Sequence, residues 1–259
     1  NEILFLNLAA KILNIKIILF EPNIVLGKSN KIFLRFCEKI FCYSDEIKNF
    51  PTKFKNKISL IPALLRKDFY NIKKNEGLNK EVNLLIIGGS QGAKLFDTFI
   101  KDSIINLSKK YKLKVFHQTN FNNYTSLKNF YLKNNVECQL FDFNKNIYEF
   151  MKKANICITR AGASTLAELV FLNIAHIAVP LPSSKENHQF ENASFYQRLD
   201  CNWIIDQNKN DEINLLSKLL NIIENKADYL SKKNNMRNYS YQNTWINVHQ
   251  KIITTINEN

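Results

Sequence analysis

The feature that most constrains the fold is the regular alternation of short apolar runs and amphipathic segments between residues 82 and 205. Runs of strand length lie at 82–87, 113–117, 136–140, 155–159, 175–179 and 203–205. The intervening segments, with apolar residues at helical spacing, are 93–110, 122–133, 146–153, 164–172 and 188–199. Strands that alternate with helices at this pitch favour βαβ units, so the sequence predicts an α/β fold with a parallel sheet.

The rest of the chain predicts flanking structure of the same kind. Strand-like runs at 16–20, 40–43 and 58–61 accompany a helix at 30–39, and residues 62–80 are polar and irregular. The last fifty or so residues contain no glycine and predict two or three helices. We therefore expect domains at 1–65 and 66–240, with a helix at 241–259 that packs back towards the N-terminal domain.

Charge and composition narrow the function classes. The chain of 259 residues has a formal net charge of +13, which is typical of proteins that meet nucleic acid or an anionic membrane surface. Its lysines are spread evenly, and no zinc-finger or RNP pattern is present, so no nucleic-acid partner is expected. The histidines lack metal-ligand spacing, so neither a metal nor a cofactor is expected, and no apolar run is long enough for a spanning helix.

Two loops hold four of the six glycines, and each follows an apolar run and precedes a helical segment. Gly88, Gly89 and Gly92 lie in G-G-S-Q-G-A, and Gly162 lies in R-A-G-A-S-T-L-A-E. In a glycine-poor chain we expect these residues where the backbone needs positive φ or a close approach to a ligand. Backbone N–H groups at the positive end of a helix dipole bind phosphate, so the corners predict a ligand with a phosphate and a second polar group.

The first loop matches neither a Walker A sequence nor G-x-G-x-x-G, and a purely structural turn is the alternative to a phosphate site. In the second loop, Thr165 and Glu168 have the spacing of a capping box. The alternative is that Glu168 accepts hydrogen bonds from two sugar hydroxyls. His188 and Gln189 stand at a predicted helix start after P-L-P, where they suit hydroxyl recognition or simple capping.

The motifs G-G-S-Q-G-A, F-H-Q-T, R-A-G-A-S-T-L-A-E, V-P-L-P and H-Q-x-x-N-A occur in this order, and the set resembles glycosyltransferase family 28. The resemblance extends from about Lys16 to Ile205. It implies the GT-B fold of two Rossmann-like domains, of which the N-terminal one is incomplete here and the C-terminal one complete. It also implies inverting transfer of GlcNAc from UDP-GlcNAc to undecaprenyl-diphospho-muramoyl-pentapeptide (lipid I to lipid II) in peptidoglycan synthesis, on the cytoplasmic face of the inner membrane.

The resemblance further implies a donor site in which Ser90 contacts the diphosphate, Glu168 the ribose, and Gln189 with His188 the GlcNAc hydroxyls. The full set of substrate-binding candidates is Asn23, Arg66, Ser90, Gln91, Asn144, Ala163, Ser164, Thr165, Leu166, Ala167, Glu168, His188 and Gln189. The sequence departs from the family where F-E-P-N replaces H-E-Q-N and P-A-L-L-R replaces G-N-P-V-R.

The catalytic base is not identified from the sequence. The family's candidate, in its first glycine-rich loop, corresponds to a position upstream of Asn1, so we expect a fragment that binds the donor and turns over poorly. Glu21 is a weak candidate, with loop capping as the alternative.

The predicted 30–39 helix has two possible roles. Its basic residues and the lysine before it lie beside two aromatic rings, and this pattern predicts either contact with anionic lipid or packing on a core. These residues are Lys28, Lys31, Arg35 and Lys39, with Phe33 and Phe36.

Other functions remain open at this point. A UDP-GlcNAc epimerase or another GT-B nucleotide-sugar enzyme would share the fold and the donor site. A non-catalytic basic binding protein or a scaffold in wall synthesis would show no specific response to UDP-GlcNAc.

Overall fold

The computed structural model describes residues 9–10, 12–73, 77–78, 81–142, 146–207 and 212–258, with the backbone alone for 90–94 and 212–214. The chain forms two compact units. The first unit consists of Asn1–Leu65 and Gln242–Asn259, and the second of Arg66–Tyr241.

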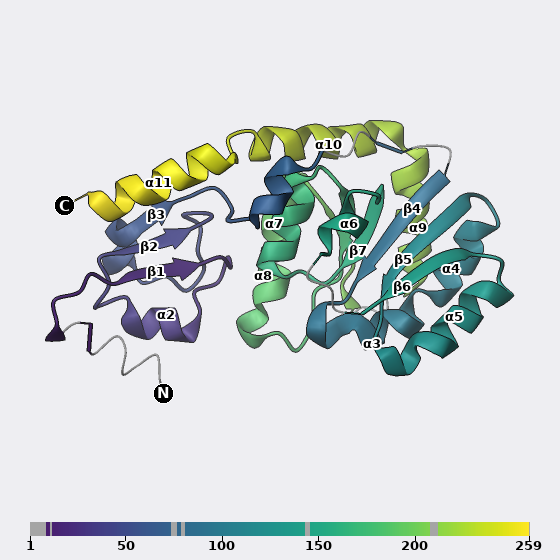
Figure 1. The fold of residues 1–259 in the computed structure, drawn as a ribbon, viewed down its shortest axis with the longest axis horizontal. Coiled ribbons are helices and arrows are strands. Elements are labelled where there is room, and N and C mark those ends of the chain that lie inside the picture. The colour runs from purple at the N-terminus through teal and green to yellow at the C-terminus, as the bar shows by residue number, and fades with distance from the viewer. Residues whose placement is uncertain are drawn as a thin grey trace. The chain divides into compact units, whose positions relative to one another are not determined.

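The second unit is built on a six-stranded sheet in the order β6-β5-β4-β7-β8-β9 (Figure 1). All five neighbouring pairs are parallel. The strands are β4 (Glu81–Ile87), β5 (Lys112–Gln118), β6 (Glu137–Phe141), β7 (Ile156–Thr159), β8 (Ala175–Ala178) and β9 (Trp203–Ile204). The predicted strands and the α/β fold class are thereby confirmed, with strand ends that differ by at most one residue.

Helices cover both faces of this sheet. Successive side chains of a strand point to opposite faces, and in the central strands the side chains on both faces are mostly apolar. The helices are α3 (Gly89–Phe99), α4 (Lys101–Ser108), α5 (Tyr124–Lys133), α6 (Tyr148–Met151), α7 (Ala163–Phe171), α8 (His188–Arg198), α9 (Glu212–Glu224) and α10 (Lys226–Ser240). Leu84 and Ile86 of β4 share one core cluster with Ile104 of α4 and Leu219 of α9. On the other face the Phe150 ring of α6 stacks 3.9 Å from the ring of Phe141.

The prediction of one helix over 93–110 is wrong at both its start and its middle. The helical backbone begins at Gly89, and α3 and α4 are separated at Ile100, whose φ of −93° and ψ of −10° depart from ideal helical values. Ile100 is fully buried together with Phe96 and Ile104. The bend therefore allows both helices to place their apolar side chains in the same cluster.

The first unit contains a three-stranded parallel sheet in the order β1-β2-β3, formed by Ile18–Glu21, Lys39–Cys42 and Ile58–Leu60. Helix α11 (Trp245–Asn257) belongs to this unit. Its Thr255 hydroxyl lies 3.2 Å from the Ser59 hydroxyl of β3. The amide of Asn243, just before α11, donates to the Ala63 carbonyl at 3.1 Å.

Helix α2 (Lys28–Phe33) is shorter than the predicted 30–39 helix. The Lys57 ammonium donates to the carbonyls of Leu34 at 2.8 Å and Cys37 at 2.5 Å, so a cation from a distant segment caps the turn that follows the helix. Lys39 begins β2 instead of ending the helix.

Among the described residues, positive φ angles occur at Gly89, as expected for the first glycine loop, but more often at asparagine. The non-glycine residues with positive φ are Asn14, Asn49, Asn135, Asn173, Glu186, Asn187 and Asp200. Gly89 fits the expectation with a φ of 65°, whereas Gly88 and Gly162 have negative φ. Asparagine tolerates the left-handed region better than most other side chains, which explains why it occupies these positions in place of glycine.

Candidate functional site

The candidate site lies at the carboxyl edge of the second unit's sheet, on either side of the point where the strand order reverses. The chain runs from β4 outward through β5 and β6, and then returns to place β7 on the other side of β4. Ile87 pairs with Thr159, so the two predicted glycine corners follow neighbouring strands directly. Crevices at such switch points are where open α/β sheets bind their ligands.

The first corner joins β4 to α3 through Gly88 and Gly89. Gly89 has a φ of 65°, and a Cβ added to it would meet no heavy atom within 4 Å. Its N–H donates to the Gln118 side-chain oxygen at 3.1 Å. The backbone of Ser90 and Gln91 continues in the first turn of α3, and their side chains lie outside the described residues.

The second corner joins β7 to α7 through Gly162, which is the N-cap residue and has extended geometry. The capping-box interpretation of Thr165 and Glu168 is wrong, because α7 already begins at Ala163 and its N-cap makes no side-chain hydrogen bond. The Leu166 N–H is the first to bond within the helix, to the Gly162 carbonyl at 3.0 Å. Helix geometry therefore leaves the N–H groups of Ala163, Ser164 and Thr165 as donors without an intrahelical acceptor.

Glu168 lies in the second turn of α7, with its side chain 12% exposed. Its Oε1 is 3.5 Å from the Arg66 Nη2, and the Arg66 guanidinium also lies 4.8 Å from the centre of the Phe69 ring. Burial raises the pKa of Glu168 to about 7, and the charge and hydrogen bond of Arg66 act against that rise. The structure thus brings together two of the predicted donor-site residues that are 102 positions apart in the chain.

The third element follows β8, where the backbone has an unusual conformation. Glu186 and Asn187 have φ values of 52° and 56° immediately before α8. Strained backbone of this kind is concentrated at functional sites. His188 Nδ1 lies 2.7 Å from the Lys185 carbonyl oxygen within the same turn.

Gln189 links this turn to the second corner. Its Oε1 accepts from the N–H of Ala161 at 3.2 Å and from the N–H of Leu181 at 3.0 Å. The Asn192 amide donates to the Ala161 carbonyl at 3.2 Å. Gln189 is therefore fixed through its oxygen, and its Nε2 group remains the part that can donate to a ligand.

Arg160 holds the exits of β7 and β8 together. Its Nη1 donates to the carbonyls of Val179 and Pro180 at 3.1 and 3.2 Å, and to Gln207 Oε1 at 2.9 Å. Burial lowers the pKa of Arg160 to about 10, so the guanidinium stays charged at neutral pH. This arginine begins the R-A-G-A-S-T-L-A-E motif, and no local sequence pattern indicates its role.

Some predicted site residues are not brought to the surface. Leu166 and Ala167 are 0% and 3% exposed, and as parts of the core they do not offer side chains to a ligand. Asn144 lies outside the described residues. Asn23 belongs to the first unit and is partly buried.

Glu21 ends β1 and is 2% exposed. Its carboxylate accepts from the N–H and side-chain amide of Asn23, from the Gly27 N–H at 2.7 Å, and from the Asn30 amide at 3.0 Å. A Cβ on Gly27 would lie 3.1 Å from the Glu21 Oε2, which explains the glycine at this position. These contacts support the loop-capping role of Glu21 over a role as base.

A buried polar cluster behind the first corner was missed by sequence reasoning. Asp97 of α3 accepts from Thr119 at 3.0 Å and from Asn123 at 2.7 Å, and its other oxygen lies 3.4 Å from His117 Nε2. His117 is fully buried with Nδ1 2.8 Å from the Tyr131 hydroxyl, and burial lowers its pKa to about 3. The histidine is thus neutral. Within the described residues, no group of His, Cys, Asp and Glu side chains is placed to hold a metal ion.

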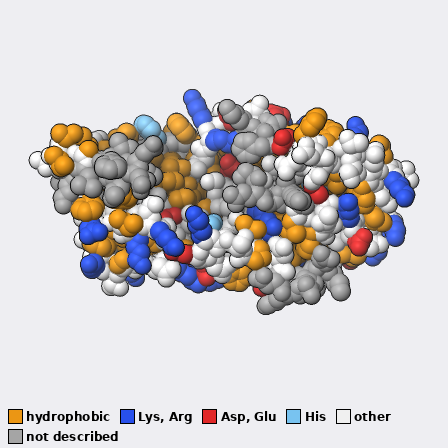
Figure 2. Space-filling view, turned by 90° about the horizontal axis from the view of Figure 1, so that it is seen from below, with side chains coloured by type: hydrophobic (Ala, Val, Ile, Leu, Met, Phe, Trp, Pro, Cys, Tyr) orange, Lys and Arg blue, Asp and Glu red, His pale blue; other side chains and the backbone are white. Residues whose placement is uncertain are grey.

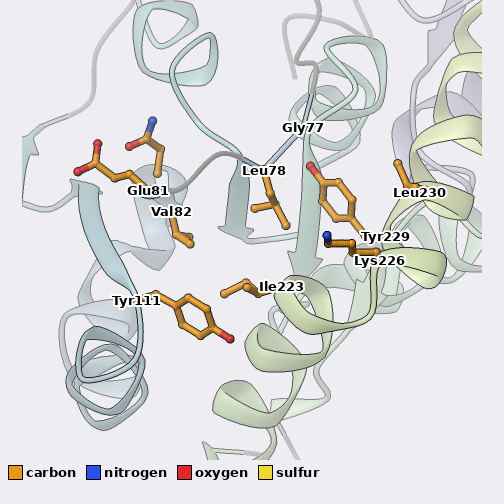
Figure 3. A pocket seen from close by; sticks show the side chains of 10 residues that line it. Gly77, Leu78, Glu81, Val82, Tyr111, Ile223, Lys226, Tyr229 and Leu230 are labelled. Atoms are coloured by element: carbon orange, nitrogen blue, oxygen red, sulfur yellow. The ribbon is translucent and has the colours of Figure 1, made fainter.

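A cavity of about 1020 Å³ lies at the opposite edge of the sheet, beside the start of β4 (Figure 3). Val82, Tyr111, Ile223 and Tyr229 line it. The Tyr229 side chain points towards Gly77, and its hydroxyl has no hydrogen-bond partner among the described residues. This cavity is separate from the strand ends that carry the two glycine corners.

Comparison with known proteins identifies relatives that cover most of the chain. The glycosyltransferase family 28 C-terminal domain matches residues 83–245. A Pelagibacter ubique protein, UDP-N-acetylglucosamine–N-acetylmuramyl-(pentapeptide) pyrophosphoryl-undecaprenol N-acetylglucosamine transferase, is 58% identical over 97% of this chain and 71% of its own length. A Rickettsia canadensis protein of the same name is 39% identical over 84% of this chain and 63% of its own length. The chain thus spans about two thirds of the length of these relatives.

Solved structures share the fold. MurG from Acinetobacter baumannii superposes with a TM-score of 0.74 at 24% identity, covering 96% of this chain and 70% of that one. The UDP-GlcNAc 2-epimerase from Neisseria meningitidis superposes with a TM-score of 0.64 at 16% identity, covering 98% and 72%. These similarities confirm the predicted GT-B architecture. Together with the family match and the 58% identity, they show that the chain belongs to glycosyltransferase family 28.

Proposed function

We propose that this chain supplies the donor site of an inverting glycosyltransferase that moves GlcNAc from UDP-GlcNAc to undecaprenyl-diphospho-muramoyl-pentapeptide, converting lipid I to lipid II. The observation that carries the proposal is the switch point between β4 and β7, flanked by the N-termini of α3 and α7 with the Glu168 carboxylate beside them. The names of the Pelagibacter and Rickettsia relatives supply the donor sugar and the lipid acceptor.

The diphosphate, the ribose and the GlcNAc of the donor each have a matching group at this edge. The N–H groups in the first turns of α3 and α7 suit the diphosphate, because they add to the positive ends of the helix dipoles. The Glu168 carboxylate has two oxygens for the two ribose hydroxyls, and Gln189 Nε2 with His188 suits the GlcNAc hydroxyls. Ser90, Gln91, Asn144 and Asn23 remain proposed contacts.

Catalysis in this scheme depends on stabilising the departing UDP. Negative charge grows on the diphosphate as the anomeric carbon is attacked, so fixed N–H donors aimed at that oxygen stabilise the transition state more than the ground state. Arg66, paired with Glu168, adds a positive charge at the same edge. Cleavage of the sugar–phosphate bond with inversion requires the acceptor hydroxyl to attack from the opposite side.

The alternative functions fit less well. An epimerase would share the fold, but the relatives at 58% and 39% identity are transferases, whereas the epimerase structure is 16% identical. Figure 2 shows Lys and Arg side chains scattered among hydrophobic and uncharged ones on the face that it draws. On this face they form no continuous basic stripe of the kind that nucleic-acid-binding surfaces use.

The decisive experiment is thermal stabilisation by UDP-GlcNAc, compared with UDP-glucose and GDP-mannose. Saturation at one hundred times Kd should stabilise the protein by about 2.7 kcal/mol with UDP-GlcNAc. The Glu168→Ala variant should lose this shift, and Glu137→Ala, which removes an exposed carboxylate of β6, should retain it. Equal shifts with all three sugar nucleotides, or none with UDP-GlcNAc, would refute the proposal.

We also propose peripheral binding to the cytoplasmic face of the inner membrane through α2 and the turn that follows it. The described residues contain no helix that could cross a bilayer. The exposed side chains here are those of Lys28, Lys31, Ile32 and Arg35. Phe33 is only 5% exposed, so its ring packs in the core and is not available for contact with lipid. Binding to vesicles rich in anionic lipid should weaken in a Lys31→Glu/Arg35→Glu variant. Unchanged binding of that variant would remove α2 and the turn that follows it from the membrane contact.

A further inference from the structure

The turn at the first corner is held from outside by a side chain of the neighbouring strand. Gln118 is the last residue of β5 and is 5% exposed. His117 pairs with Ile86 in the parallel register, so Gln118 stands beside the exit of β4. Its Oε1 accepts from the Gly89 N–H at 3.1 Å.

This hydrogen bond acts on the residue with the least usual conformation of the corner. Gly89 has a φ of 65° at the start of an eleven-residue helix. Without an acceptor, its N–H would be one of the orphan donors of the helix N-terminus. Gln118 satisfies that donor and thereby fixes the peptide plane from which the next N–H groups of α3 project.

The second corner is held in the same way. Gln189 Oε1 accepts from the N–H of Ala161 at 3.2 Å, just before Gly162. Both strand exits next to the switch point therefore use the oxygen of a carboxamide. A carboxylate would make a stronger hydrogen bond with the same N–H, but its negative charge would repel an anionic ligand at the same edge.

We infer that Gln118 is a positioning residue for the diphosphate of the donor: its neutral oxygen holds the Gly89 turn without adding negative charge to the phosphate-binding corner. This inference rests on the proposed function. It assigns a role to the glutamine of F-H-Q-T, which acts through the backbone of Gly89 and does not itself touch the sugar.

The test compares UDP with uridine as ligands, by titration calorimetry for UDP and by NMR shift titration for uridine. In Gln118→Glu the acceptor and the side-chain shape remain, but a negative charge is added. We expect affinity for UDP to fall by about tenfold or more at low salt, with a smaller loss at high salt, and affinity for uridine to stay within about twofold. Gln139→Glu, the same change at an exposed position of β6, should leave both affinities unchanged.

A second measurement reads the hydrogen bond itself. The Gly89 amide should exchange slowly with solvent in the unliganded protein and rapidly in Gln118→Met, which removes the acceptor. Fast exchange in the wild-type protein would overturn the inference even if a Gln118 variant failed to fold.

The binding results distinguish this inference from the proposed function. If UDP binds the wild-type protein and Gln118→Glu equally well, the inference fails and the proposed function stands. If neither UDP nor UDP-GlcNAc binds the wild-type protein, the proposed function fails.

Discussion

The Glu168 side chain is largely buried, yet it lies at the edge of the sheet where its carboxylate is proposed to bind the ribose of the donor. Its side chain is 12% exposed, and burial raises its pKa to about 7. Arg66 at 3.5 Å offsets part of the cost of ionisation. Near neutral pH the free protein therefore contains a mixture of protonated and ionised Glu168, and the ionised form is the one that can accept from two hydroxyls.

The raised pKa predicts how stability depends on pH. Because the folded pKa lies above the ordinary glutamate value of 4.5, the folded state binds this proton more tightly than the unfolded state does. The contribution to stability is complete below about pH 4.5 and is lost as pH rises through 7. We expect Glu168→Gln to increase the free energy of unfolding by about 1–3 kcal/mol at pH 8 and by under about 1 kcal/mol at pH 5.

Urea unfolding at the two pH values measures this difference. Glu137→Gln, at a carboxylate that is 57% exposed, serves as the control and should change little at either pH. The same Glu168→Gln variant should bind UDP-GlcNAc more weakly, so stability and binding move in opposite directions. A variant that is less stable at pH 8 would show that the ionised carboxylate stabilises the fold.

At the scale of helices, the C-terminal turns of α5, α7 and α8 share one geometry. Each is followed by a residue of positive φ, namely Asn135, Asn173 and Asp200. In each case the next N–H bonds back to a carbonyl five residues earlier: Val136 to Tyr131, Ile174 to Leu169 and Cys201 to Tyr196. This is the Schellman arrangement, which other proteins usually form with glycine.

Asn135 offers a clean test of this geometry, because it is exposed and has a φ of 54°. Asn135→Ala should destabilise the protein by about 1 kcal/mol, since a Cβ without a polar group disfavours the left-handed region. Asn135→Gly should be close to neutral, because two effects oppose each other. Glycine adopts positive φ without strain in the folded state, but it also raises the conformational entropy of the unfolded chain. Thermal unfolding measures both changes.

The matched control is Asn129→Ala, at an exposed position inside the same helix. Alanine favours a helix interior over asparagine, so this change should be neutral or slightly stabilising. A similar loss of stability at positions 129 and 135 would mean that left-handed geometry is not the cause.

The elements that the sequence predicts well are those decided by local pattern. The strands follow from apolar runs of the right length, and the corners follow from the glycine loops between them. The predictions for the middle of 93–110 and the end of 30–39 were wrong, because a buried Ile100 and the ammonium of Lys57, both tertiary effects, decide them. The capping-box prediction was wrong for a local reason: the N-cap of α7 is Gly162, three residues before Thr165.

The candidate site shows the same division. The pairing of Glu168 with Arg66 joins residues 102 positions apart, and nothing in either local sequence indicates it. The role of Gln118 depends on the register between β5 and β4, which no local pattern specifies. The motifs therefore locate the edge of the sheet, and long-range geometry determines which atoms are available there.

At the scale of the molecule, most proposed donor contacts lie in the second unit, Arg66–Tyr241, which has its own sheet and core. Asn23 is the proposed contact from the first unit. We predict that a chain of residues 66–241 folds alone and binds UDP-GlcNAc within about tenfold of the full chain, since loss of one hydrogen-bonded contact costs about 1 kcal/mol. Circular dichroism and calorimetry check folding and affinity.

The control for this comparison is Asn23→Ala in the full chain. If Asn23 accounts for the difference, its substitution should reduce affinity to the value measured for residues 66–241. A folded 66–241 chain with no measurable affinity would show that the first unit contributes far more to donor binding than one side chain.

The strand order has a consequence for how the protein is made. The central strand β4 pairs with β7 on one side, and Ile156 follows its partner Leu84 by 72 residues along the chain. At synthesis rates of about 5–20 residues per second, roughly 4–14 s separate the emergence of these partners from the ribosome. Throughout that interval β4, whose last four residues are apolar and buried in the folded protein, has one unpaired edge, so we expect the nascent chain to depend on chaperones until β7 has been translated.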